Sequence, residues 1–173
     1  LAVPLALFSI ALLVMVLIPH VGLTVKGSSR WLRAGPANFQ PSELAKFSTL
    51  VFLAWWMARV QRHSLELVRG LVIPLVGLGL ILGLVFIEPD FGTTMLIGMV
   101  GMTVLFVGGS RVSYLVVAAA IGVCGFTLAI MQDAERMRRI TALLNPEKYA
   151  KDEAFQLLNA ILAFVSGRGP GVG

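Results

Sequence analysis

The sequence predicts an all-α fold: a polytopic bundle of about five transmembrane helices, followed by amphipathic helices on the membrane surface. Of the 173 residues, 57% are hydrophobic and only 13% are charged. The mean hydropathy is +0.87. A soluble domain of this length carries about twice that share of charge, roughly 25%. The apolar residues are also gathered into segments long enough to cross a bilayer, which indicates an integral membrane protein.

Five apolar segments predict the spans, at residues 2–22, 41–60, 71–87, 92–108 and 112–131. Each can cross as a helix, because a helix satisfies its own backbone hydrogen bonds in hydrocarbon. The first segment has no basic leader or cleavage site, so we expect it to be a retained span. The chain begins at Leu1 and stops in a glycine-rich run, so we expect the middle of a longer polypeptide.

Small residues in the third and fourth segments predict close packing between helices. These residues are Gly77, Gly79, Gly83, Gly98 and Gly101. Near the end of the second segment, Trp55 and Trp56 precede a basic turn, the position expected of aromatic anchors at the membrane interface.

The segment after the fifth span, residues 133–166, has apolar residues at helical spacing but no uninterrupted crossing. It therefore predicts two short amphipathic helices that lie along the membrane surface.

The charge balance argues for an anionic lipid or ligand and against nucleic acid. The formal charge is +5, but the cations lie in loops between apolar segments without interleaved aromatic residues that could stack on bases. Cys124 is the only cysteine, which excludes an intramolecular disulfide and a thiolate metal site. His20 and His63 have no partner at metal-ligand spacing.

The distribution of cations between loops leaves the orientation open. Five crossings place the loops at 23–40, at 88–91 and after 132 on one side, and those at 59–70 and 109–111 on the other. Counted up to residue 166, the first side has eight lysines and arginines and the second has four. Taken alone, the positive-inside rule puts the first side in the cytoplasm. A binding site for an anion would gather cations on its own side in either topology.

The stretch NFQPSELAKF, residues 38–47, carries ionisable side chains into the start of an apolar segment. Glu43 and Lys46 are three residues apart, so on a helix they share a face and can neutralise each other. Charged groups at membrane depth are costly and commonly functional. Two interpretations are open: a structural pair that fixes the start of the second span, and a binding site for a ligand.

Three further polar groups lie on the same predicted side. Glu88 and Asp90 flank Pro89 in a tight turn between two spans. Asp90 can cap the following helix, pair with Lys46 or Arg30, or help to bind a divalent cation. Arg30 is followed by Trp31, and its planar cation suits either a pyrophosphate or a lipid headgroup. The run containing Arg136, Arg138 and Arg139 is expected to face solvent or headgroups.

Four motifs carry a resemblance to a known family: SSRWLRAG, FQPSELAKF, EPDFGTT and RMRRITALLNPE. In this order and spacing they resemble the SEDS family (shape, elongation, division and sporulation), the FtsW/RodA-like peptidoglycan glycosyltransferases. The family motif QPDLGT stands here as EPDFGT, so Asp90, Gly92 and Thr93 match while Glu88 and Phe91 depart.

The resemblance implies a multi-pass protein of the bacterial cytoplasmic membrane, with ten spans in full. It implies glycan-strand polymerisation at the outer face from lipid II, an undecaprenyl-pyrophosphate-linked precursor, and a class B penicillin-binding protein as partner. The chain would supply spans three to seven and the first half of a large extracytoplasmic loop, so the motif-rich side is external. The family's catalytic aspartate would lie beyond Gly173, which leaves the catalytic residue of this chain unknown.

Our leading hypothesis is a membrane glycosyltransferase for cell division or cell shape. Arg30 and Lys46 would hold the anionic substrate, and Glu43 would orient Lys46. Asp90 would shape the cavity or help to place Mg²⁺ or Mn²⁺, which neutralise pyrophosphate oxygens. The alternatives are a lipid II flippase, in which the same polar groups form a path for the headgroup, and a scaffold that only docks a partner.

Overall fold

The structure is a computed structural model that describes residues 1–18, 22–25, 28–34, 37–132, 137, 141 and 155–167. Side chains are not described at residues 22–30, 33–34, 37 and 155–157. The chain divides into two compact units, Leu1–Ala119 and Ala120–Gly173. All the site residues that the structure describes belong to the first unit.

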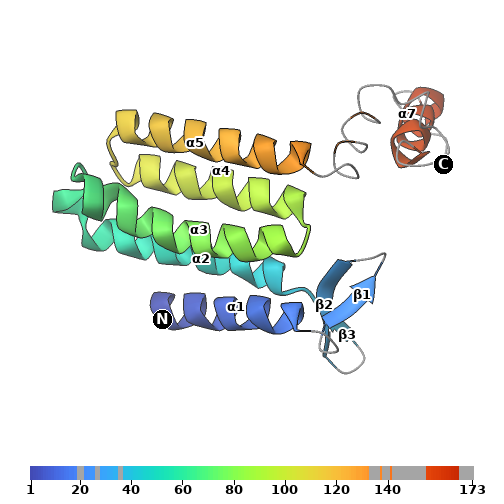
Figure 1. Ribbon diagram of the computed structural model, residues 1–173, viewed down its shortest axis with the longest axis horizontal. Helices are drawn as coiled ribbons and strands as arrows, with labels where there is room; N and C mark the ends of the chain where they lie inside the picture. Colours follow the sequence, from blue (N-terminus) through green and yellow to red (C-terminus); the bar gives the residue numbers. More distant parts are fainter. Residues whose placement is uncertain are drawn as a thin grey trace. The chain divides into compact units, whose positions relative to one another are not determined.

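Helices account for most of the described residues, as the sequence predicts. They are α1 (Ala2–Leu17), α2 (Pro41–Arg59), the 3₁₀ turn η1 (Gln61–His63), the π turn η2 (Val68–Val72), α3 (Ile73–Ile87), α4 (Phe91–Val107), α5 (Val112–Met131) and α7 (Phe155–Gly167). Figure 1 shows α1 to α4 lying alongside one another. α2 and α3 each have a proline in the first turn, where its missing N–H costs no helical hydrogen bond.

Among the residues that the structure describes, two helical stretches are long and apolar enough to cross a membrane: Val68–Ile87, with a mean hydropathy of 2.7, and Val112–Met131, with 2.3. Shorter apolar helices are Ala2–Leu17, Phe91–Val107 and Leu158–Gly167. α2 bears Glu43, Lys46 and Arg59 along its length, which lowers its hydropathy. The membrane character of the chain is therefore supported, and the number of crossings stays a prediction.

The prediction of an all-α chain is wrong between α1 and α2, where an antiparallel sheet lies. Its strands are β1 (Gly22–Val25), β2 (Ser28–Ala34) and β3 (Ala37–Phe39), in the order β1-β2-β3. Leu23 pairs with Trp31, and Arg33 pairs with Asn38. Turn-type residues separate the strands in the sequence, Gly27 in one gap and Gly35 with Pro36 in the other. The strands are short and contain little alternation, which explains why this segment resembled a loop.

The first predicted span was also too long, because α1 ends at Leu17 and β1 begins at Gly22. Figure 1 shows the sheet at one end of α1 and α2, which we call the sheet end of the first unit. Of the surface helices predicted at 133–166, the structure describes α7, and most of residues 133–154 lie outside the described part.

The core of the first unit is apolar and draws on every helix of the bundle. Leu13 of α1, Leu53 of α2, Ile81 of α3 and Leu105 of α4 are at most 1% exposed, and Leu115 of α5 joins the same cluster. Large apolar side chains also lie on the outside of the helices, as at Phe47, Val76 and Phe106. An apolar exterior over an apolar core is what a bundle surrounded by lipid requires.

Only some of the predicted close-packing glycines fulfil that role. A Cβ added to Gly77 would lie 2.8 Å from the Phe52 ring, and one added to Gly101 would lie 2.7 Å from a Leu78 methyl. At Gly98 the nearest atom, on Leu82, is 3.9 Å away, which is ordinary contact. A Cβ added to Gly79 or Gly83 would meet no atom of a neighbouring segment within 4 Å in the described part of the chain, so the prediction is wrong there.

A glycine that the sequence did not single out is more tightly enclosed. A Cβ on Gly70 would overlap the carbonyl oxygen of Ser64, a backbone atom that cannot rotate away. We expect Gly70→Ala to lower the stability of the full-length protein by about 1–3 kcal/mol, the usual cost of overpacking. Thermal unfolding in detergent measures the effect.

The matched control is Gly83→Ala, because position 83 is helical and open. This variant should unfold at or slightly above the temperature of the unsubstituted protein, because alanine favours helix over glycine. Equal unfolding temperatures for the two variants would contradict the assigned packing of Gly70.

Candidate functional site

The structure brings two of the predicted polar clusters together at the sheet end. The first two turns of α2 carry Glu43 and Lys46, and the turn between α3 and α4 carries Glu88 and Asp90. Figure 1 shows both of these turns on the side of the bundle where the sheet lies. A direct contact joins them: Gln40 Nε2 donates to Asp90 Oδ2 at 3.3 Å.

Asp90 is the N-cap of α4, as one of the sequence interpretations predicts. Its Oδ1 accepts from the Thr93 backbone N–H at 3.2 Å, and its carbonyl oxygen accepts from Thr94 Oγ1 at 2.7 Å. With Gln40 on Oδ2, both carboxylate oxygens have protein donors, and the residue is 9% exposed. Asp90 therefore starts α4 and ties it to α2. No ion pair joins it to Lys46 in the described part of the chain.

Gln40 is a site residue that sequence reasoning missed. It is the N-cap residue of α2, and its Nε2 donates to Ser42 Oγ at 2.9 Å as well as to Asp90. Ser42 is fully buried. The signal was available, because a polar residue directly before a proline that opens a helix occupies the cap position.

Glu43 and Lys46 form the predicted pair on one face of α2. Lys46 Nζ donates to Glu43 Oε1 at 2.8 Å. The Glu43 side chain is 54% exposed and that of Lys46 is 27% exposed, so a ligand can reach both. An exposed pair of this kind contributes at most about 1 kcal/mol to stability. Its larger effect is to hold the ammonium group of Lys46 in one place.

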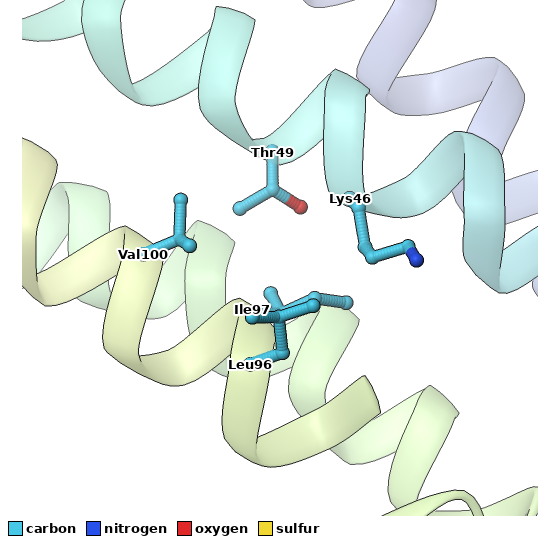
Figure 2. Close-up of a pocket in the computed structure, with 5 residues that line it drawn as sticks. All are labelled: Lys46, Thr49, Leu96, Ile97 and Val100. Atoms are coloured by element: carbon cyan, nitrogen blue, oxygen red, sulfur yellow. The ribbon is translucent and has the colours of Figure 1, made fainter. Parts of the chain in front are cut away.

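Beside Lys46 lies a small hollow of about 80 Å³ between α2 and α4. Figure 2 shows its lining: Lys46 and Thr49 from α2, and Leu96, Ile97 and Val100 from α4. Thr49 Oγ1 donates to the Ala45 carbonyl at 2.7 Å, so its hydroxyl is already engaged with its own helix. The hollow is thus apolar, with a single cation at its border.

Glu88 is the C-cap residue of α3 and is 1% exposed. A carboxyl group at this depth is costly, so its presence two residues before Asp90 makes this turn a polar centre in an apolar bundle.

For several predicted site residues, the structure does not describe the position of the side chain relative to Glu88 and Asp90. Arg30 lies in β2, but its side chain is outside the described part, and Arg136, Arg138 and Arg139 are outside it altogether. For a metal, the described residues contain no group of three or more His, Cys, Asp or Glu side chains suited to hold an ion. Asp90 could supply one ligand at most, and both of its oxygens already accept hydrogen bonds.

A comparison with protein families decides the classification. The FtsW/RodA/SpoVE family, described as "Cell cycle protein", matches residues 1–173. The chain belongs to this family. The resemblance inferred from the four motifs is therefore confirmed.

Relatives within the FtsW/RodA/SpoVE family include two described as "Probable peptidoglycan glycosyltransferase FtsW". The protein from Methylomonas methanica is 38% identical over 171 residues, which is 98% of this chain and 44% of the relative. The protein from Burkholderia thailandensis is 38% identical over 173 residues, which is 96% of this chain and 37% of the relative. The chain thus spans less than half the length of these relatives.

Solved structures of the family resemble the fold. The crystal structure of Thermus thermophilus rod shape determining protein RodA matches with a TM-score of 0.62 and 29% identity, over 75% of this chain and 40% of that one. A chain from a structure described as a peptidoglycan synthase complex, in which polymerisation and crosslinking are coordinated, matches with a TM-score of 0.70 and 27% identity. That match covers 94% of this chain and 47% of the other.

The geometry of Asp90 gives a prediction on stability. We expect Asp90→Ala to destabilise the full-length protein by about 1 kcal/mol, because an N-cap acceptor is lost at α4. The stability of Asp90→Asn should stay within about 0.3 kcal/mol of that of the unsubstituted protein, because asparagine is an equally good N-cap. Thermal unfolding in one detergent compares the two. If both variants lost the same stability, the negative charge and not the cap would be what holds the turn.

Proposed function

We propose that the full-length protein is a membrane peptidoglycan glycosyltransferase that polymerises glycan strands from lipid II during cell division or cell shape maintenance. The observation that carries the proposal is the meeting of FQPSELAKF and EPDFGTT at one end of an apolar bundle, through the contact of Gln40 with Asp90. Relatives that match almost the whole chain are described as peptidoglycan glycosyltransferases. A polar site at the end of apolar helices suits a substrate with a lipid anchor and a polar head.

The proposed topology has five crossings of the bacterial cytoplasmic membrane, with the sheet end at the outer face and α7 on the membrane surface. Four observations support it. The bundle has an apolar exterior, α2 carries its charges near its two ends, the solved family structures match the fold, and α7 is amphipathic. Lipid II would then approach the sheet end from the outer leaflet.

Among the residues whose side chains the structure describes, Lys46 is the proposed ligand of the pyrophosphate. Its ammonium group is held by Glu43 at 2.8 Å and borders the apolar hollow. A phosphate oxygen next to the ammonium group would leave the first carbons of the prenyl chain beside Leu96, Ile97 and Val100. Arg30, in β2, would add a second cation.

In this proposal the chemical step needs a general base that lies beyond Gly173. That base would take the proton of an acceptor sugar hydroxyl, whose oxygen attacks the anomeric carbon of the donor. The bond from that carbon to the lipid pyrophosphate breaks, and a single displacement inverts the configuration. Lys46 and Arg30 would stabilise the pyrophosphate that leaves.

Asp90 would act by positioning two helices of the site. Through Gln40 it fixes α4 against α2 and so sets the width of the hollow. A role for Mg²⁺ or Mn²⁺ stays a prediction, because the described residues do not make a complete site. A class B penicillin-binding protein is the proposed partner, since a chain of similar fold has been solved in a peptidoglycan synthase complex.

The test is polymerisation of lipid II by the purified full-length protein, reconstituted without another polymerase. We expect Lys46→Gln, Arg30→Ala and Asp90→Ala to reduce glycan synthesis at least tenfold, with Lys46→Gln raising KM most because it removes a charge that binds the ground state. Glu43→Gln should have a smaller effect, because the lysine charge remains.

Gln61→Ala is the matched control, since this exposed residue lies in η1 between α2 and α3. It should retain full activity. Undiminished chain growth in the Lys46, Arg30 and Asp90 variants would contradict the assigned roles. Movement of lipid II between leaflets without any chain growth would contradict the proposed reaction itself.

A further inference from the structure

The end of the first unit opposite the sheet carries a second cluster of polar groups, which the proposed function does not use (Figure 1). We call it the arginine end and define it by Arg59, Arg62, Arg69 and Arg111. It is assembled from three segments: the last turn of α2, residues 61–70, and the turn between α4 and α5.

Two hydrogen bonds hold these segments together. Trp56 Nε1 in α2 donates to the Arg69 carbonyl at 3.0 Å. From the other side, Ser110 Oγ donates to the carbonyl of the adjacent Gly70 at 2.7 Å, in a buried position. Because both bonds end on neighbouring carbonyls, Arg69 and Arg111 are brought to the same surface as the end of α2.

The surface has an excess of positive charge. Residues 59–70 and 108–114 contain four arginines and one carboxylate, Glu66, which gives a net charge of +3 with His63 neutral. Glu66 lies 3.8 Å from Arg69 and 4.0 Å from His63. Within the described residues, Arg59, Arg62 and Arg111 have no carboxylate in ion-pair distance. Like charges held together in this way favour an anionic ligand.

Aromatic rings fix the orientation of two guanidinium groups. Arg59 lies over the Trp55 ring at 5.6 Å, and Arg111 lies over the Tyr114 ring at 5.4 Å. Arg111 Nη1 also donates to the Tyr114 hydroxyl at 3.2 Å. A guanidinium has five N–H donors, so contact with one ring leaves others available, and a pair of them matches two phosphate oxygens.

The depth of the cluster points to a lipid. Both stretches that can cross a membrane begin here: Arg69 is the second residue of Val68–Ile87, and Arg111 directly precedes Val112–Met131. Apolar side chains beside the arginines are exposed, at 62% for Leu65, 49% for Leu67 and 56% for Val68. Such side chains would be unfavourable in water next to a soluble acidic partner, whereas the headgroup region accommodates both kinds of group.

We propose that the arginine end binds the phosphate headgroup of an anionic phospholipid. The guanidinium groups take the phosphate, and the exposed leucines and Val68 lie against the upper acyl chain. The site is independent of the proposed catalytic function, because it lies at the other end of the helices and shares no residue with it.

The experiment uses the full-length protein in zwitterionic phosphatidylcholine nanodiscs that contain a small fraction of spin-labelled phosphatidylglycerol. We expect contact of the label with the protein to exceed that of labelled phosphatidylcholine, and the excess to fall with added salt. Arg62→Gln should weaken the preference for phosphatidylglycerol about fivefold, and Arg69→Gln with Arg111→Gln about twenty-fivefold, the size of one and two surface cations.

Glu66→Gln is the matched variant that removes a negative charge, whereas the arginine variants remove positive charges. It removes the one carboxylate of the surface, so it should strengthen the preference for phosphatidylglycerol. Arg111→Lys keeps the charge but loses the planar donors. Its preference for phosphatidylglycerol should therefore lie between that of the unsubstituted protein and that of Arg111→Gln. Unfolding temperatures in pure phosphatidylcholine should be alike for all variants, because the substituted side chains are exposed.

Three results would overturn the proposal. One is an equal preference for the two labelled lipids in the unsubstituted protein. Another is a preference for phosphatidylglycerol that none of the arginine substitutions changes. The third concerns a second measurement, the binding of an acidic peptide to the same variants. If the arginine variants lost peptide binding while their lipid contact stayed unchanged, the surface would belong to a protein partner.

Discussion

The structure depends on how an apolar bundle accommodates polar groups at its ends. Inside the bundle the helices satisfy their own backbone hydrogen bonds, but the first N–H groups of each helix have no such partner. Asp90 supplies the acceptor for α4, and the same carboxylate receives Gln40 from the start of α2. One side chain therefore completes a helix and joins two helices, which fixes the position of everything carried by their first turns.

This arrangement anchors the backbone of the candidate site and leaves its charged side chains accessible. Ala45 and Ser48 of α2 are fully buried, and they anchor the face of the helix opposite Glu43 and Lys46. Glu43 and Lys46 can then project from a fixed backbone. A charged side chain held by a neighbour at 2.8 Å loses little further conformational freedom when an anion binds. The apolar hollow beside it provides an environment in which that charge interacts more strongly than in water.

The sequence predicted the helices well because each is a long apolar run bounded by polar residues. The predicted fifth span, 112–131, coincides with α5. The sheet was missed because its strands are three to seven residues long and owe their pairing to one another, which no single strand reveals. Gly79 and Gly83 were assigned to helix contacts from their type alone, since the sequence does not show which face of a helix meets its neighbour.

The polar cluster at Asp90 could be expected from sequence, but its partner could not. Spacing within one helix predicts that Glu43 meets Lys46, because residues three apart share a face. Gln40 and Asp90 are fifty positions apart, and only the packing of α2 on α4 brings them together. The arginine end follows the same rule, since Ser110 reaches Gly70 across forty positions. At both ends of the bundle, short-range pairs set the orientation of charges, while long-range hydrogen bonds decide which charges share a surface.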